Sequence, residues 1–103
     1  MIKRIETRDD WQTILDNDGI AVVNFTTLSS NPCRFINLEF DKLPREYGSV
    51  VFAQVDVDES VEIAQENGIV ATPTFKFYVQ GVALDEYTGA DIEEIRVRIC
   101  QLT

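Results

Sequence analysis

Two nearly continuous apolar stretches, residues 20–25 and 50–57, dominate the hydrophobic pattern of this chain. Such runs are typical of strands that are buried on both faces of a sheet. Residues 2–6 alternate weakly between apolar and polar side chains and predict a short strand. Residues 74–79 and 82–87 predict two more strands, and the Gln80-Gly81 pair between them favours an antiparallel hairpin.

Segments with helical spacing of apolar residues separate these strands. Thr7 is a good N-cap for the first helix. Asn31 is the expected N-cap of the second, with Pro32 in the first helical position, where its missing N–H would be unpaired anyway. Pro44 is expected to bend or end that helix near residue 43. A short helix is predicted to begin at Asp58, and a last one follows residue 91.

The predicted order is therefore β-α-β-α-β-α-β-β-α. This alternation implies parallel strands with helices on both faces, and the final hairpin adds an antiparallel edge. We expect an α/β fold with a mixed sheet of about five strands and about four helices. No linker, repeat or low-complexity segment interrupts the chain, so residues 1–103 are predicted to form one domain.

Composition narrows the possible functions. The net charge of −9 at pH 7 argues against nucleic acid as a partner, because phosphate binding requires a basic face. No apolar run approaches the roughly 20 residues of a membrane span, and no secretory leader is visible, so a cytoplasmic location is expected. With no histidine and two cysteines, neither a Ser-His or Cys-His pair nor a thiolate zinc site is expected, and no cofactor is predicted.

Candidate chemistry centres on the segment after the first buried strand. There the sequence Ser30-Asn31-Pro32-Cys33 enters a helix and places a thiol in its first turn. This position can favour a thiolate if the sulfur is also accessible. Cys100 lies off the apolar side of the last helix and is expected to be an inert thiol, with a disulfide between two molecules as the alternative.

The motif resembles the Cys-Gly-Pro-Cys redox site of the thioredoxins, with serine in place of the first cysteine. Other parts of the chain match that family in the same order: residues 21–25, residues 52–58, Thr72-Pro73-Thr74-Phe75, Gly81 and Gly89. The resemblance covers nearly the whole chain and implies the thioredoxin fold. It also implies a cis bond before Pro73 and a peptide-binding role for the backbone of Thr72.

The same resemblance puts the family's chemistry in doubt. A dithiol cycle needs an attacking and a resolving thiol. Ser30 stands at the attacking position, does not ionise near neutral pH, and has no histidine to activate it. Asn24 replaces the buried aspartate that helps the resolving cysteine lose its proton, and Ser29 replaces a tryptophan. These accompanying changes favour natural divergence over a single engineered replacement.

Three functions remain open at this stage. The leading one is a thioredoxin-like protein that binds peptides or proteins but is impaired as a disulfide reductase. The second is a single-thiol redox protein that forms mixed disulfides through Cys33, and the third is a structural subunit of a larger complex. The resemblance suggests thioredoxin reductase or glutathione as possible partners. The candidate residues are Cys33, Ser30 and Asn24 for chemistry, and Ser29, Asn31, Pro32, Thr72 and Pro73 for peptide binding.

Overall fold

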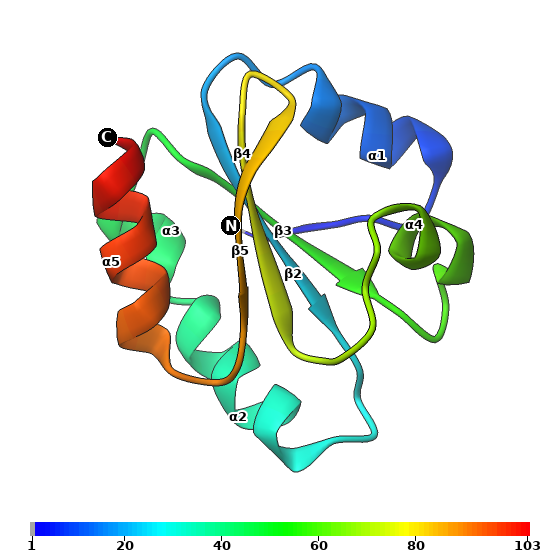
Figure 1. Cartoon of the computed structure of the whole chain (residues 1–103). Helices are drawn as coiled ribbons and strands as arrows, with labels where there is room; N and C mark the ends of the chain where they lie inside the picture. The colour runs from blue at the N-terminus through cyan, green and yellow to red at the C-terminus, as the bar shows by residue number, and fades with distance from the viewer. Residues whose placement is uncertain (1) are drawn as a thin grey trace.

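The computed structural model describes residues 2–103. A five-stranded mixed sheet with helices on both faces organises the chain (Figure 1). The strand order across the sheet is β1-β3-β2-β4-β5. The strands are β1 (Ile2–Arg4), β2 (Ile20–Thr26), β3 (Val51–Asp56), β4 (Thr74–Val79) and β5 (Val82–Thr88). The predicted fold class is therefore confirmed.

The strand directions differ from the prediction at β4. β3 runs parallel to both β1 and β2, but β4 is antiparallel to β2 as well as to β5. Phe25 of β2 pairs with Val55 on one side and Thr74 on the other, so β3 ends at the edge of the sheet where β4 begins. The connection through α4 therefore does not carry the chain back across the sheet, as a parallel strand would require.

Five helical segments cover the sheet, of which α3 is a single turn. They are α1 (Arg8–Leu15), α2 (Asn31–Phe40), α3 (Leu43–Glu46), α4 (Val61–Glu66) and α5 (Ile92–Leu102). Thr7 caps α1 as predicted, with the reciprocal side-chain bonds of a capping box through Asp10. The predicted start of a helix at Asp58 is wrong, because α4 begins three residues later, after Ser60.

Pro44 acts differently from the expectation. α2 already ends at Phe40, and α3 begins at Leu43 with Pro44 in its first turn. A proline is tolerated there because the first N–H groups of a helix have no intrahelical partner. The interruption therefore lies upstream of the proline, and Pro44 favours the restart rather than causing the end.

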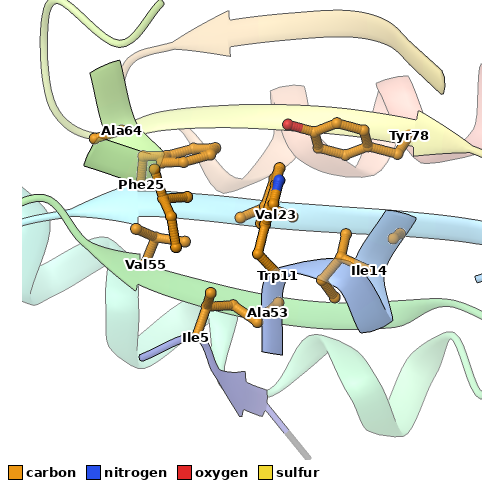
Figure 2. Packing of buried hydrophobic residues seen from close by; sticks show 11 residues of the cluster. Ile5, Trp11, Ile14, Val23, Phe25, Ala53, Val55, Ala64 and Tyr78 are labelled. Carbon is orange, nitrogen blue, oxygen red and sulfur yellow. The ribbon is translucent and has the colours of Figure 1, made fainter. Parts of the chain in front are cut away.

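Two apolar layers hold the helices against the sheet. Figure 1 shows α1 and α4 on one face and α2, α3 and α5 on the other. On the first face, Trp11 packs edge-on against Tyr78 and tilted against Phe25 (Figure 2). On the second, Phe40 of α2 contacts Phe52 and other buried residues of the sheet. The sheet is thus covered on both faces, as the apolar runs in β2 and β3 predicted.

Candidate functional site

The site is built where four strands meet one edge of the sheet. β2, β3 and β5 end there and β4 begins there, because Thr74 pairs with both Phe25 and Thr88. The segments that join these strands to α2, α4 and α5 consequently lie at the same edge. The Thr72–Pro73 peptide bond, directly before β4, is cis, as the family resemblance implied.

Ser30, rather than the predicted Asn31, is the N-cap of α2. Its backbone is extended and its Oγ accepts a bond from the backbone N–H of Cys33 at 3.5 Å. Asn31 and Pro32 then occupy the first two helical positions and are exposed. A serine hydroxyl is as good an N-cap as an amide, and its place before Pro32 leaves the proline inside the first turn.

The Cys33 sulfur lies among polar groups although its side chain is fully buried. Burial raises the pKa of the thiol, but the polar groups near the sulfur, which are the Thr27 backbone and three hydroxyls, outweigh this effect. The hydroxyls belong to Thr26, Ser30 and Thr72. Together they leave the pKa of Cys33 below its ordinary value. This arrangement brings Cys33, Ser30 and Thr72 together, as predicted.

Thr26 is a member of this group that sequence reasoning missed. Its side chain is buried, and its hydroxyl has no hydrogen-bond partner among the described residues. The nearby Cys33 sulfur explains how such a hydroxyl is tolerated. The available signal was a threonine at the polar end of an otherwise apolar strand.

Asn24 lies beneath α2 as a buried amide. Its Nδ2 donates to Oδ1 of Asn37 at 2.7 Å, whereas its own Oδ1 has no partner among residues 2–103. Both side chains are neutral at every accessible pH, so this position cannot accept a proton from Cys33. The pairing with Asn37 was not predicted, since Asn37 lies on a helix 13 residues further along the chain.

Ser29 is held by a network that the sequence did not reveal. The Thr27 hydroxyl donates to Asp58 at 2.6 Å and lies 2.9 Å from the Ser29 hydroxyl. The Ser29 backbone N–H donates back to Thr27 at 3.3 Å. Asp58 therefore fixes the loop before α2 from the neighbouring strand exit.

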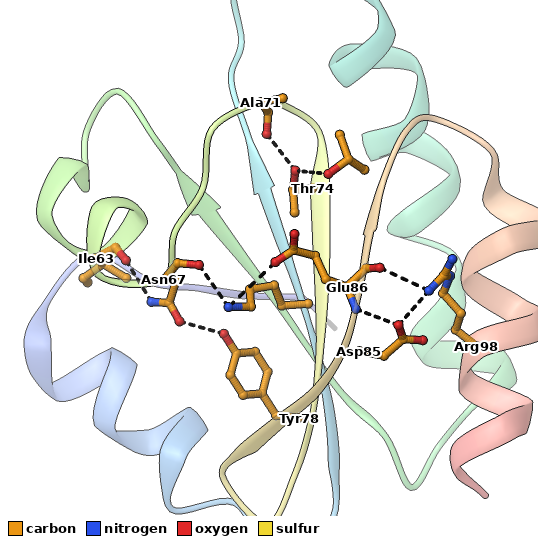
Figure 3. Close-up of polar contacts among 10 residues, drawn as sticks. Ile63, Asn67, Ala71, Thr74, Tyr78, Asp85, Glu86 and Arg98 are labelled. Carbon is orange, nitrogen blue, oxygen red and sulfur yellow. Dashed lines mark hydrogen bonds and ion pairs between the residues drawn. The ribbon is translucent and has the colours of Figure 1, made fainter.

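A second network fixes the loop of the cis-proline (Figure 3). The Thr74 hydroxyl donates to the Ala71 carbonyl at 2.7 Å and lies 2.8 Å from the Thr88 hydroxyl. The Pro73 carbonyl accepts from the Gly89 N–H at 3.1 Å. Thr72 between them has no backbone hydrogen bond to any described residue. Its N–H and C=O are thus available on an otherwise fixed loop.

Large apolar side chains are exposed on the segments that carry Thr72 and Cys33. Leu28 is 58% exposed before α2, Phe35 is 70% exposed on α2, and Val70 is 98% exposed in the loop before Pro73. Exposed apolar groups that gather around a rigid polar site are typical of surfaces that bind other proteins. Sequence reasoning missed them because each is an ordinary residue in isolation.

Comparison with known proteins places this arrangement in a family. The thioredoxin family model matches residues 3–100. The chain belongs to the thioredoxin family. It is 36% identical to rabbit thioredoxin and 35% identical to human thioredoxin, with 99% of each chain covered in both comparisons.

Solved structures agree with this assignment. The thioredoxin of Fasciola hepatica superposes with a TM-score of 0.93 at 30% identity, covering 99% of this chain and all of the other. A structure from work on the thiol resolving mechanism of yeast mitochondrial 1-Cys peroxiredoxin via glutathione/thioredoxin systems superposes with a TM-score of 0.91. It is 26% identical and covers 98% of this chain and 95% of the other. The family fold is therefore present essentially from end to end.

Within this thioredoxin fold, Cys33 and Cys100 are both free thiols, the first buried and the second exposed on α5. No group of three or more potential ligands that could hold a metal occurs within residues 2–103. None of the helices in this part of the chain is long and apolar enough to cross a membrane.

Proposed function

We propose that this thioredoxin-family protein binds peptides or partner proteins and does not turn over disulfides through a dithiol cycle. The observation that carries the proposal is the pairing of Ser30 and Cys33 at the start of α2. The Ser30 oxygen accepts a bond from the Cys33 N–H, and a hydroxyl cannot form a disulfide with the sulfur beside it. Asn24 removes the proton acceptor as well.

An extended peptide binds to a rigid segment whose backbone N–H and C=O groups are free, and Thr72 provides such groups. Its N–H and C=O have no partner among the described residues, while Thr74 and Pro73 on the following positions are held by hydrogen bonds. An extended peptide can add to such a segment by main-chain bonds. The exposed Leu28 and Phe35 would then contact its side chains.

The partner class follows from the family. The similar yeast structure concerns peroxiredoxin and the glutathione/thioredoxin systems. On the basis of this similarity we propose a protein partner for the present chain. Thioredoxin reductase and glutathione are the candidate redox partners. A cytoplasmic location remains part of the proposal.

A second function, single-thiol exchange through Cys33, is favoured by one observation. The hydroxyls around the sulfur hold the pKa of Cys33 below its ordinary value. A Cys33 thiolate would attack one sulfur of a disulfide such as glutathione disulfide. A new mixed disulfide would form, the other sulfur would leave as a thiolate, and the Cys33 proton would pass to solvent. Full burial of the side chain opposes this reaction.

Insulin reduction with NADPH and thioredoxin reductase tests the main proposal. The wild-type protein is expected to give no turnover above the uncatalysed rate. Ser30→Cys should gain measurable activity if the rest of the site is sound, and Ser30→Cys with Asn24→Asp should gain more. Sustained turnover by the wild-type protein would refute the proposal.

The rate of Cys33 alkylation across pH separates the two functions. Cys100→Ser removes the competing exposed thiol. A sulfur that serves only the structure should react in the folded protein far more slowly than after unfolding. Fast modification in the folded protein, with a midpoint below the ordinary value of about 8.5, would instead support single-thiol chemistry.

A further inference from the structure

A groove along α2 adjoins the site described above and shares Leu28 with it. Its volume is about 480 Å³, within the range of sites that hold a ligand or a few residues of a peptide. It is lined by Ile2, Arg4, Leu28, Arg34, Asn37, Leu38, Asp41 and Gln54, which come from β1, β3, α2, the loop before α2 and the residue directly after it. Neither Cys33, Thr72 nor Pro73 lines it.

A row of polar side chains leads from the outer strand into this part of the sheet. Arg4 of β1 pairs with Gln54 of β3, and Gln54 pairs in turn with Asn24 of β2. Their side chains therefore share one face of the sheet. Arg4 is exposed, Gln54 is half-buried and Asn24 is buried. Gln54 lines the groove and is half-buried, so its amide is accessible to a bound ligand.

The groove also holds positive charge that is not neutralised. Lys3, Arg4, Arg34 and Arg45 are the cations that form no ion pair within residues 2–103, and two of them line the groove. These cations stand out in a chain whose net charge is −9. Arg34 is held in place because its Nε donates to the Leu28 carbonyl at 2.8 Å, which leaves its terminal N–H groups available.

Apolar side chains accompany these donors. Leu28 and Leu38 are 58% and 62% exposed, and both line the groove. The only acid among the lining residues, Asp41, follows the last turn of α2, seven positions after Arg34. The groove is thus basic toward the start of the helix, acidic beyond its end, and apolar along its rim.

From this complementarity we infer that the groove is a docking site for an acidic segment of a protein partner, with apolar residues on either side of a carboxylate. The carboxylate binds between Arg4 and Arg34, with the amides of Gln54 and Asn37 within the same groove. The flanking apolar side chains contact Leu28 and Leu38. This second interaction surface does not depend on the chemistry of Cys33 and stands whether or not the thiol reacts.

Fluorescence polarisation with a short labelled peptide in which leucine alternates with glutamate tests the inference. The same peptide with lysine in place of glutamate controls for apolar binding. Arg4→Gln and Arg34→Gln should each raise the Kd of the acidic peptide roughly two- to fivefold, the size expected for partly exposed charge pairs. Arg45→Gln makes the same change of charge at an exposed cation that also lacks an ion pair but lies outside the groove, and it should leave the Kd unchanged.

Side-chain amide signals in NMR spectra locate the bound peptide. Those of Asn37 and Gln54 should shift as the acidic peptide is added, and the backbone signals of Thr72 should not. Equal binding of the lysine peptide, an equal loss in Arg45→Gln, shifts confined to Thr72, or no binding at millimolar peptide would each overturn the inference. The Asn37 and Gln54 signals report binding in the groove, and the Thr72 signals report binding at the cis-proline. The experiment therefore tests the groove separately from the proposed peptide binding at the cis-proline.

Discussion

The buried amide of Asn24 allows a sharp test of how this site differs from a redox site. In Asn24→Asp the side chain keeps its size, but a carboxyl replaces an amide in a position with no exposed surface. When protonated, the carboxyl can still donate to Asn37 in place of Nδ2. When ionised, it loses that donor and places a negative charge in a fully buried position. The variant should therefore be close to wild type in acid and weakened at neutral pH.

The size and sign of the effect follow from linkage. In the unfolded chain the new carboxyl ionises near pH 3.9, whereas full burial raises the pKa by up to about 3–5 units. Between the two values the unfolded state has lost a proton that the folded state retains, so stability falls as pH rises. A pKa raised by about 3 units corresponds to about 4 kcal/mol, a large part of the roughly 5–15 kcal/mol of a typical domain.

Urea denaturation of the wild type and of Asn24→Asp, from pH 4 to pH 8, measures this difference in the free energy of unfolding. Asn31→Asp is the matched control, because it introduces the same carboxyl at an exposed position in the first turn of α2. There the charge should stabilise the helix slightly, by about 0.3–1 kcal/mol. If Asn24→Asp showed the same stability difference from wild type at pH 4 and pH 8, the pKa of the new carboxyl would not be raised by burial. That result would refute the prediction.

Three further predictions use matched positions and are read as free energies of unfolding. Gly81→Ala should lower the free energy of unfolding by more than about 1 kcal/mol. The φ of Gly81 is +78°, and an added Cβ would lie 2.1 Å from the carbonyl oxygen at the end of α1. Gly48→Ala is the control and should not destabilise the protein, because an added Cβ there meets no atom within 4 Å. Thr7→Ala should cost about 1 kcal/mol by removing the cap of α1, and an unchanged value would mean that the capping bonds contribute nothing. Phe40→Ala should cost about 3–5 kcal/mol because the ring is fully buried, whereas Phe35→Ala on the same helix, 70% exposed, should stay within about 0.5 kcal/mol.

Much of the fold could be predicted because hydrophobic periodicity reports burial. The runs in β2 and β3 are apolar on both faces since helices cover both, and Thr7 began α1 through a purely local capping bond. The direction of β4 could not be predicted in this way. It depends on the edge at which β3 ends and β4 begins, which is a property of pairing between distant strands.

The site was predictable where its residues follow one another in the chain. Ser30, Cys33 and the cis-proline were found from a short motif and its family resemblance. Asn37 and Asp58 were missed because each acts across the fold, the first from α2 onto β2 and the second from the exit of β3. The cap itself was misplaced by one residue, since Ser30 and Asn31 are equally good capping residues and only the backbone geometry distinguishes them.

The meeting of four strand ends at one edge has a consequence for how this protein can change. The segments at that edge, residues 27–30, 57–60, 67–73 and 89–91, join the ends of the strands to the helices. Val57 and Ile69 pack against the buried cluster of the first face, so only the exposed positions of these segments are free to change. Exchanges at those positions would alter the recognition surface on a frame that already folds without an internal disulfide.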